Sequence, residues 1–197
     1  MDTDLLYALM GFAFVTSITP GPNNLMLMAS GANFGFRRSI PHMLGIGIGF
    51  VVMVTLVGLG LMGLFDRYPV THTMLKVFSA AYMLWLAWKI ANAAAPEQSK
   101  ATGQPLSLLQ AAGFQWVNPK AWAMALTAIT AYAPDRSLAA IFLVAAVFGA
   151  INLPCVSSWT LIGQQIRRCL GTAGRLRAFN WTMAGLLIVS MIPLLAP

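Results

Sequence analysis

The sequence predicts an all-α integral membrane protein, with six transmembrane helices arranged as two inverted three-helix repeats. Three observations predict this fold class. Hydrophobic residues make up 58% of the 197-residue chain and charged residues only 9%, whereas about 25% of a soluble domain is charged. Six segments are long and apolar enough to cross a bilayer, which takes about 20 residues. Two of these segments carry a similar polar interruption, nearly half a chain apart.

The predicted spans form a single transmembrane domain over residues 1–197. The first repeat covers about 1–95 and the second about 107–197. The longest polar stretch, at about 96–106, is expected to be a flexible linker between them. The spans are, in chain order, 5–31, 40–64, 73–94, 107–131, 137–162 and 177–196.

Lysine and arginine between the spans predict the orientation, because cytoplasmic loops carry an excess of them. One side has Arg37, Arg38, Lys89, Lys100, Arg167, Arg168, Arg175 and Arg177. The other side has Arg67, Lys76 and Arg136. The richer side is expected in the cytoplasm, which puts both termini outside. An odd number of helices per repeat gives the second repeat the opposite polarity, as in many secondary transporters.

The motif "SITPGPNN" interrupts the first predicted span at Pro20, Gly21 and Pro22. A proline inside a helix removes a backbone donor and frees a carbonyl one turn earlier. In hydrocarbon such a break persists only where protein or a polar cavity covers it. Asn23 and Asn24 then begin a half-helix whose N-terminus suits an anion such as a carboxylate. The structural alternative is a kink packed against neighbouring helices.

The motif "QWVNPKAW" interrupts the fourth span at Pro119 and places Lys120 deep within it. No acidic residue is predicted at that depth, since the five acids (Asp2, Asp4, Asp66, Glu97 and Asp135) fall in termini or loops. We therefore predict that the carboxylate of a substrate is the counter-ion of Lys120. Two alternatives are a lysine that snorkels to an interface and a span shifted towards the cytoplasm. Gln115, Trp116 and Asn118 would complete the polar lining.

The two breaks together predict one substrate site in the middle of the membrane. The substrate's carboxylate would meet Lys120 and the half-helix N-terminus, and in a zwitterionic substrate the ammonium would meet freed carbonyls near Thr19 and Val117. The predicted substrate-binding residues are Thr19, Pro20, Gly21, Pro22, Asn23, Asn24, Gln115, Asn118, Pro119 and Lys120.

Other polar or small residues in the spans are interpreted mainly as structural. Asn152 and the serines that follow it suit interhelical packing more than ligand binding, and Gly45 and Gly49 suit close helix approach. His42 follows Pro41 near the cytoplasmic start of its span. An interfacial role is favoured for it, with a proton relay as the minor alternative.

The sequence contains no phosphate-binding loop, HExxH motif, metal-ligand cluster, carboxylate dyad or Ser-His-Asp set. It therefore lacks the machinery of an ATP-driven pump or a membrane hydrolase, and we expect no cofactor and no metal. The basic residues stand singly or in pairs, which topology explains better than nucleic-acid binding. The expected partners are a small-molecule substrate and the lipid bilayer, and homo-oligomerisation is left open. The alternatives to a secondary transporter are a membrane-embedded enzyme and a non-transporting scaffold.

Three stretches carry a resemblance to a known family. "TPGPNNLMLMASGANFGFRRSIPHMLGIGIGF", "AAYMLWLAWKIA" and "FQWVNPKAW" together resemble the LysE/RhtB family of bacterial amino-acid exporters. The likeness runs along essentially the whole chain and is greatest to the cysteine/O-acetylserine exporter branch, where TPGPNN and WLAWKIA occur in similar form.

The resemblance implies a proton-driven exporter of small neutral amino acids or derivatives in the bacterial inner membrane. Cysteine, O-acetylserine and threonine- or homoserine-like compounds are the implied substrates, and another small metabolite on the same fold is the alternative. Family-level importance falls on Pro20, Gly21, Pro22 and Asn23 in the first motif, and in the second on Asn118, Pro119 and Lys120. Many relatives carry Asp where this chain has Asn23, so one candidate proton carrier is missing. The cysteine/O-acetylserine branch need not keep the proline of the second motif.

Overall fold

A computed structural model describes residues 2–61, 67–68, 70–93 and 104–190 of the chain. The regular structure of these residues is helical, without a strand, so the all-α prediction is confirmed for this part of the chain. The elements are α1 (Thr3–Ile18), α2 (Pro22–Phe34), α3 (Phe36–Leu56), the π-helical turn η1 (Val57–Leu61), α5 (Val70–Ala91), α6 (Leu108–Phe114), the 3-10 turn η2 (Gln115–Val117), α7 (Pro119–Tyr132), α8 (Leu138–Cys169) and α9 (Ala173–Val189).

Most helices start at a side chain that can accept from a free backbone N–H group, which otherwise has no partner at a helix start. At the start of α6, Ser107 accepts from Gln110 N at 3.2 Å and Gln110 Oε1 accepts from Ser107 N at 3.1 Å, a capping box. Single side-chain caps start four other helices: Asp2 for α1, Asn118 for α7, Ser137 for α8 and Thr172 for α9.

Three helical segments in the described residues are long and apolar enough to cross a membrane: Phe36–Leu61, Thr73–Ala91 and Leu138–Cys169. A fourth results if α1 and α2, bent by 53° at a short break, count as one span. The remaining predicted spans correspond to α6–α7, which is split into short helices, and to α9, which has 17 residues. Six spans therefore stay a prediction.

The predicted boundaries differ most at α8, which continues to Cys169 although the predicted span ends at 162. Its last turns contain Gln164, Arg167 and Arg168, which are good helix formers, and the arginines suit the negative end of the helix dipole. These polar residues end the hydrophobic segment, but the helix continues through them. Most of the predicted linker at about 96–106 lies outside the described residues.

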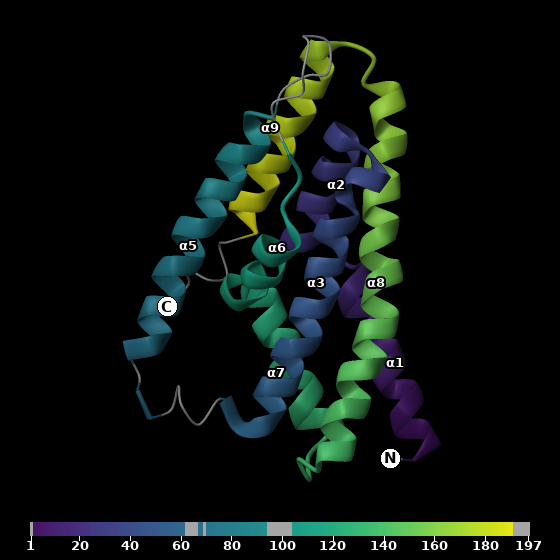
Figure 1. The fold of residues 1–197 in the computed structure, drawn as a ribbon, viewed down its shortest axis with the longest axis vertical. Helices are drawn as coiled ribbons and strands as arrows, with labels where there is room; N and C mark the ends of the chain where they lie inside the picture. The colour runs from purple at the N-terminus through teal and green to yellow at the C-terminus, as the bar shows by residue number, and fades with distance from the viewer. Residues whose placement is uncertain (1, 62–66, 69, 94–103, 191–197) are drawn as a thin grey trace.

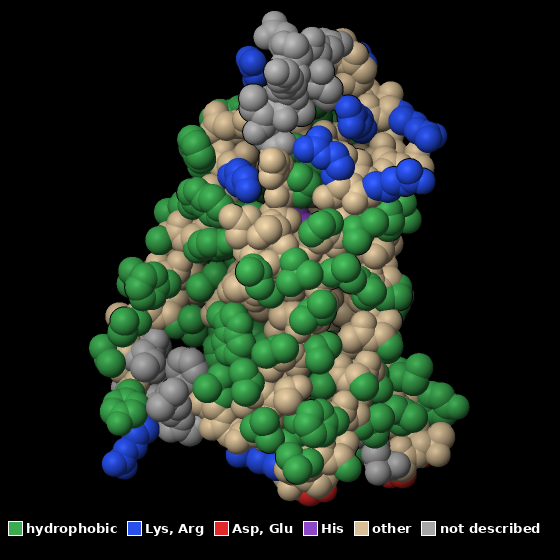
Figure 2. Space-filling model, viewed as in Figure 1, with side chains coloured by type: hydrophobic (Ala, Val, Ile, Leu, Met, Phe, Trp, Pro, Cys, Tyr) green, Lys and Arg blue, Asp and Glu red, His purple; other side chains and the backbone are tan. Residues whose placement is uncertain are grey.

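The helices run alternately along the long axis of the molecule (Figure 1). The chain rises through α1 and α2, descends through α3, rises through α5, descends through α6 and α7, rises through α8 and descends through α9. The long α8 packs against α1, α2 and α3, while α5 and α9 pack mainly against each other. Figure 2 shows Lys and Arg side chains gathered at the upper end, where α8 ends and α9 begins.

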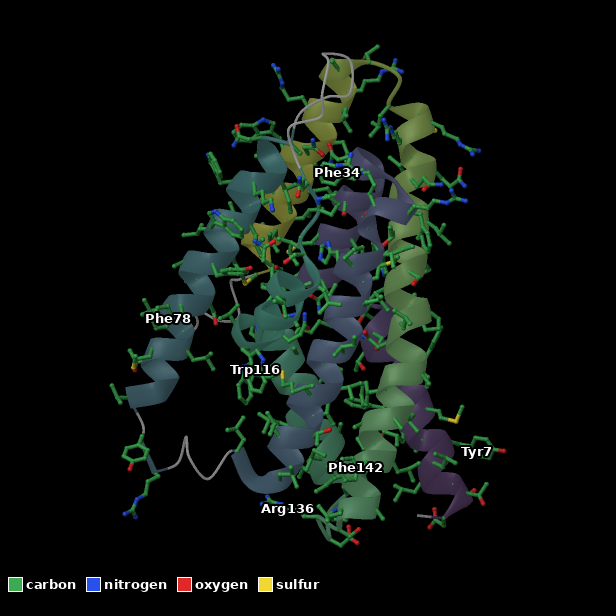
Figure 3. All side chains as sticks on the ribbon, in the orientation of Figure 1. Tyr7, Phe34, Phe78, Trp116, Arg136 and Phe142 are labelled. Carbon is green, nitrogen blue, oxygen red and sulfur yellow. The ribbon has the colours of Figure 1, made fainter. Side chains whose placement is uncertain are left out.

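The surface below that basic end is largely hydrophobic (Figure 2). Tyr7, Phe78 and Phe142, labelled in Figure 3, come from α1, α5 and α8 and are all more than half exposed. Large apolar side chains on several faces are typical of a protein whose solvent is lipid.

Glycines bring the central helices into backbone contact. A Cβ atom at Gly31 of α2 would overlap the carbonyl oxygen of Thr160 in α8, and one at Gly163 of α8 would overlap that of Met28. Gly45 and Gly49 of α3 face α6 in the same way. The close approach predicted for the last two is confirmed. Small residues at such crossings are a common means of packing membrane helices.

Candidate functional site

The first break separates α1 from α2 over three residues. Thr19 is extended, with φ −64° and ψ 145°, because a residue before proline avoids the helical conformation. Gly21 is also extended, and Pro22 is the first residue of α2. Proline suits that position, since its missing N–H would have no helical partner there. The predicted interruption is confirmed and lies between Ile18 and Pro22.

Side chains from nearby helices satisfy the carbonyls freed at the end of α1. Asn24 Nδ2 donates to the carbonyl oxygens of Ser17 at 2.9 Å and Thr19 at 2.8 Å. The indole N–H of Trp159 in α8 donates to the carbonyl of Ile18 at 3.0 Å. In this state Asn24 uses its amide N–H groups within the protein, rather than offering them to the carboxylate for which the sequence suggested them.

The second break has a related geometry. After the 3-10 turn, Asn118 is extended (φ −92°, ψ 109°), and its side chain accepts from Lys120 N at 3.1 Å. Pro119 is the first residue of α7. Both downstream half-helices therefore begin with a proline. The structural counterpart of Pro119 is Pro22, two residues after the Pro20 with which the sequence motif was paired.

The two breaks meet through an amide pair. Asn23 Nδ2 donates to Gln115 Oε1 at 2.8 Å, and Gln115 Nε2 donates to Asn23 Oδ1 at 3.2 Å. Gln115 is fully buried and also donates to the carbonyl of Ala111 at 2.9 Å. Trp116, the residue after Gln115, marks this level in Figure 3, away from both ends of the molecule.

Lys120 forms the second link between the breaks. Its Nζ donates to the carbonyl oxygen of Thr19 at 2.8 Å, to Thr19 Oγ1 at 3.0 Å and to the carbonyl oxygen of Pro20 at 3.3 Å. These oxygens follow the C-terminal end of α1, where the helix dipole is negative and favours a cation. Lys120 thus holds the Thr19 carbonyl, one of the two positions that the sequence suggested for the substrate's ammonium.

A small cavity of about 20 Å³ lies beside this link. That volume holds about one water molecule. Asn152 Nδ2 donates to Ser17 Oγ at 3.1 Å, while Asn152 Oδ1 is buried and has no hydrogen-bond partner among the described residues. The lining includes Ser17, Asn23, Asn24, Asn118, Lys120 and Asn152. An acceptor without a partner in a polar cavity is suited to an N–H donor.

A second cavity of about 440 Å³ opens on another side of Lys120. Its lining residues are Pro20, Gly21, Pro22, Lys76, Pro119, Lys120, Ala123 and Ser190. Lys120 and Gly21 line both cavities. The lysine therefore stands between a small cavity and a much larger one.

Every residue of the predicted substrate site lies in the two breaks or in the first turns of α2 and α7. Sequence reasoning missed Ser17 and Trp159 as partners of the first break and gave Asn152 only a packing role. A polar residue in the middle of the apolar α8 was the available signal for Asn152. Among the described residues no group of His, Cys, Asp or Glu is placed to hold a metal ion.

Comparisons with known proteins match nearly the whole chain. A family model described as "LysE type translocator" matches residues 14–194. A cysteine/O-acetylserine efflux protein of Klebsiella pneumoniae is 29% identical over 95% of this chain and 95% of its own length. Proteins of the same name from Salmonella choleraesuis and Escherichia coli O1:K1 are each 31% identical, covering 89% and 95% of this chain and 90% and 96% of their own lengths. No solved structure matches.

Proposed function

This chain belongs to the LysE type translocator family, and from that membership we propose that it exports small neutral amino acids or close derivatives. Cysteine, O-acetylserine and threonine- or homoserine-like compounds are the proposed substrates, since several relatives are named cysteine/O-acetylserine efflux proteins. Membership of a translocator family makes the chain a transporter rather than an enzyme. Export across the bacterial inner membrane by a secondary, proton-driven mechanism is part of the proposal.

The observation that carries the proposal is the link from Lys120 in one break to Thr19 and Pro20 in the other. A zwitterionic amino acid can provide a new partner for the groups on both sides of that link. Its ammonium would take the carbonyl oxygens after α1, and its carboxylate would accept from the displaced Lys120. Asn152 Oδ1 offers a further acceptor for the ammonium. Each charge of the substrate then has a partner when it leaves water.

Helix packing supports the inverted-repeat part of the proposal. A two-fold relation between α1–α5 and α6–α9 would exchange α3 with α8 and α1 with α6. The contact of α3 with α6 then corresponds to that of α8 with α1, and both contacts are present. The α3–α8 and α5–α9 contacts would lie on the two-fold axis. The proposed boundary between the repeats lies between α5 and α6.

Efflux from loaded vesicles tests the proposal. Purified protein is reconstituted, the vesicles are loaded with labelled cysteine, O-acetylserine, threonine, homoserine or leucine, and efflux is followed with and without a pH gradient. We expect efflux of at least one of these amino acids and a faster rate with the gradient. If none of them leaves faster than from protein-free vesicles, the exporter assignment is wrong.

Lys120→Met tests the proposed site separately. The variant should export the same amino acid at least about tenfold more slowly, because a charge-assisted hydrogen bond contributes about 1.5–3 kcal/mol. Arg177→Met removes an exposed cation of α9 away from both breaks and is the matched control. If Lys120→Met exports at the rate of the control, the exporter assignment stands and the proposed substrate site is wrong.

A further inference from the structure

A third cavity, of about 320 Å³, lies between α2, α3 and α5 at the basic end of the molecule. It shares no lining residue with either cavity at the breaks. Phe34 lines it and is labelled near the upper end in Figure 3. This is the end that the excess of Lys and Arg predicts to face the cytoplasm (Figure 2). An exported molecule would therefore pass this cavity before it reaches the breaks.

His42 in the wall of this cavity is a buried polar group without a partner. Its side chain is 2% exposed, and neither ring nitrogen has a hydrogen-bond partner among the described residues. A neutral imidazole has one N–H donor and one acceptor nitrogen, and leaving both unpaired costs stability. Buried polar groups in native proteins nearly always have a partner. A molecule that enters the cavity can supply the missing one.

Lys89 adds a positive charge to the same wall. Its Nζ lies 5.4 Å from the centre of the Trp85 ring, and no carboxylate among the described residues pairs with it. Lys89 and His42 line the same cavity. The charged group that fits beside Lys89 is an anion, and the lone pair of a neutral imidazole suits an N–H donor.

The rest of the wall is mainly apolar. Met26, Leu86 and Leu106 are buried side chains that line it. The volume lies at the lower end of the range for small-molecule sites in proteins. The occupant should therefore be small, with one carboxylate, one amino group and an uncharged body.

We propose that this cavity is a second binding site for the exported amino acid, at the cytoplasmic end and separate from the breaks. Lys89 donates to the carboxylate, His42 accepts from the amino group, and the side chain lies against Met26 and Leu86. The inference rests on the proposed function. It assigns His42 a substrate contact, in place of the interfacial or proton-relay role considered from the sequence.

The test measures efflux from vesicles while the internal concentration of the exported amino acid is varied. Lys89→Met and His42→Leu should each raise the internal KM by about tenfold, since each removes one hydrogen bond to a charged group. The maximal rate should stay within about twofold, because the breaks are intact. Arg177→Met is the control, since it removes an exposed cation of α9 that lines neither this cavity nor the two at the breaks, and it should keep the wild-type internal KM.

Thermal unfolding separates a substrate contact from a structural role. Because His42 makes no hydrogen bond to the described protein, His42→Leu removes none and should unfold at the wild-type temperature or above. His42→Gln keeps a polar acceptor and should have an internal KM between those of His42→Leu and the wild type. A lower unfolding temperature with an unchanged KM would show that His42 is only structural.

The outcomes distinguish the two proposals. If the wild type exports an amino acid and both variants keep its internal KM, the second site is wrong and the exporter assignment stands. If the wild type exports none of the tested amino acids, the exporter assignment fails, and the second site fails with it.

Discussion

At the scale of single residues, Lys120 and Gly21 depend on each other. A Cβ atom at Gly21 would lie 2.7 Å from Lys120 Cδ and 3.1 Å from Nζ. Gly21 is extended and needs no special backbone freedom. The glycine is required by the space that the lysine occupies. The presence of glycine as the second residue of the PGP motif is therefore explained by Lys120, a residue in the other half of the chain.

Gly21→Ala should lower export by about tenfold or more while changing stability by only about 0.5 kcal/mol. The lysine chain is flexible and can move aside, but its Nζ then leaves the Thr19 and Pro20 carbonyls. Vesicle efflux and thermal unfolding measure the two effects. Gly113→Ala, at an open position in the helix before the second break, is the control and should change neither. Wild-type export by Gly21→Ala would contradict the role given to the lysine.

The Asn23–Gln115 pair should show energetic coupling in a double-mutant cycle. Unfolding free energies of Asn23→Ala, Gln115→Ala and the double variant should give an interaction energy of about 0.6–1.7 kcal/mol, the range for interhelical hydrogen bonds in membranes. Asn23→Ala with Asn92→Ala is the control cycle, since Asn92 follows α5 and donates to the carbonyl of Trp88 in that helix, away from Asn23 in the sequence. Additive effects for the Asn23–Gln115 cycle would mean that the amide pair does not hold the breaks together.

At the scale of elements, the sequence predicted where the helices break but not which groups the breaks contact. Pro20, Pro22 and Pro119 act through local backbone chemistry, so their effect can be inferred from a single segment. The hydrogen bonds of Asn24 and Lys120 depend on the folded position of α1, which no local pattern encodes. For the same reason the role of Gly31 and Gly163 was missed, because each glycine faces a helix distant in sequence.

The α2–α8 crossing should be the packing contact most sensitive to an added methyl group. Gly163→Ala and Gly31→Ala should each lower the unfolding free energy by about 1–3 kcal/mol, because the new Cβ would overlap a backbone carbonyl that cannot move alone. Denaturation in detergent, followed by circular dichroism, gives the measurement. Gly185→Ala in α9, where nothing lies within 4 Å, is the control. Equal stability of all three variants would contradict the crossing.

At the scale of the whole molecule, the charge distribution could be predicted from the sequence because it is a sum over many residues. The inverted repeat stays a proposal. The basic residues gather at one end of the structure, as the loop count predicts (Figure 2). The six predicted spans are confirmed only in part, since α6, α7 and α9 are each too short to be recognised as spans by length and composition. Hydrophobicity identifies membrane segments, but the contacts of a broken segment depend on how it packs against other helices.

The chain's two cysteines allow a direct test of orientation. Cys169 is exposed at the end of α8, and Cys155 is buried. In a Cys155→Ala background, a membrane-impermeant maleimide should label Cys169 in inside-out vesicles and not in intact spheroplasts. Asp135→Cys in a background without other cysteines should label in the reverse pattern, because residue 135 lies beyond the other end of α8. Labelling of Cys169 from outside would invert the proposed topology.

The bond from Lys120 to the end of α1 also bears on how the transporter returns after releasing its cargo. A carrier whose empty site holds an unsatisfied charge tends to be an obligatory exchanger, because it needs a new ligand before it can reorient. Here the protein supplies its own substitute for the cargo, since the Thr19 and Pro20 oxygens satisfy the lysine. We therefore expect net efflux into medium free of amino acid to proceed at least as fast as one-for-one exchange. Lys120 would return to the Thr19 and Pro20 oxygens after each release, so the empty transporter could reorient without a new ligand.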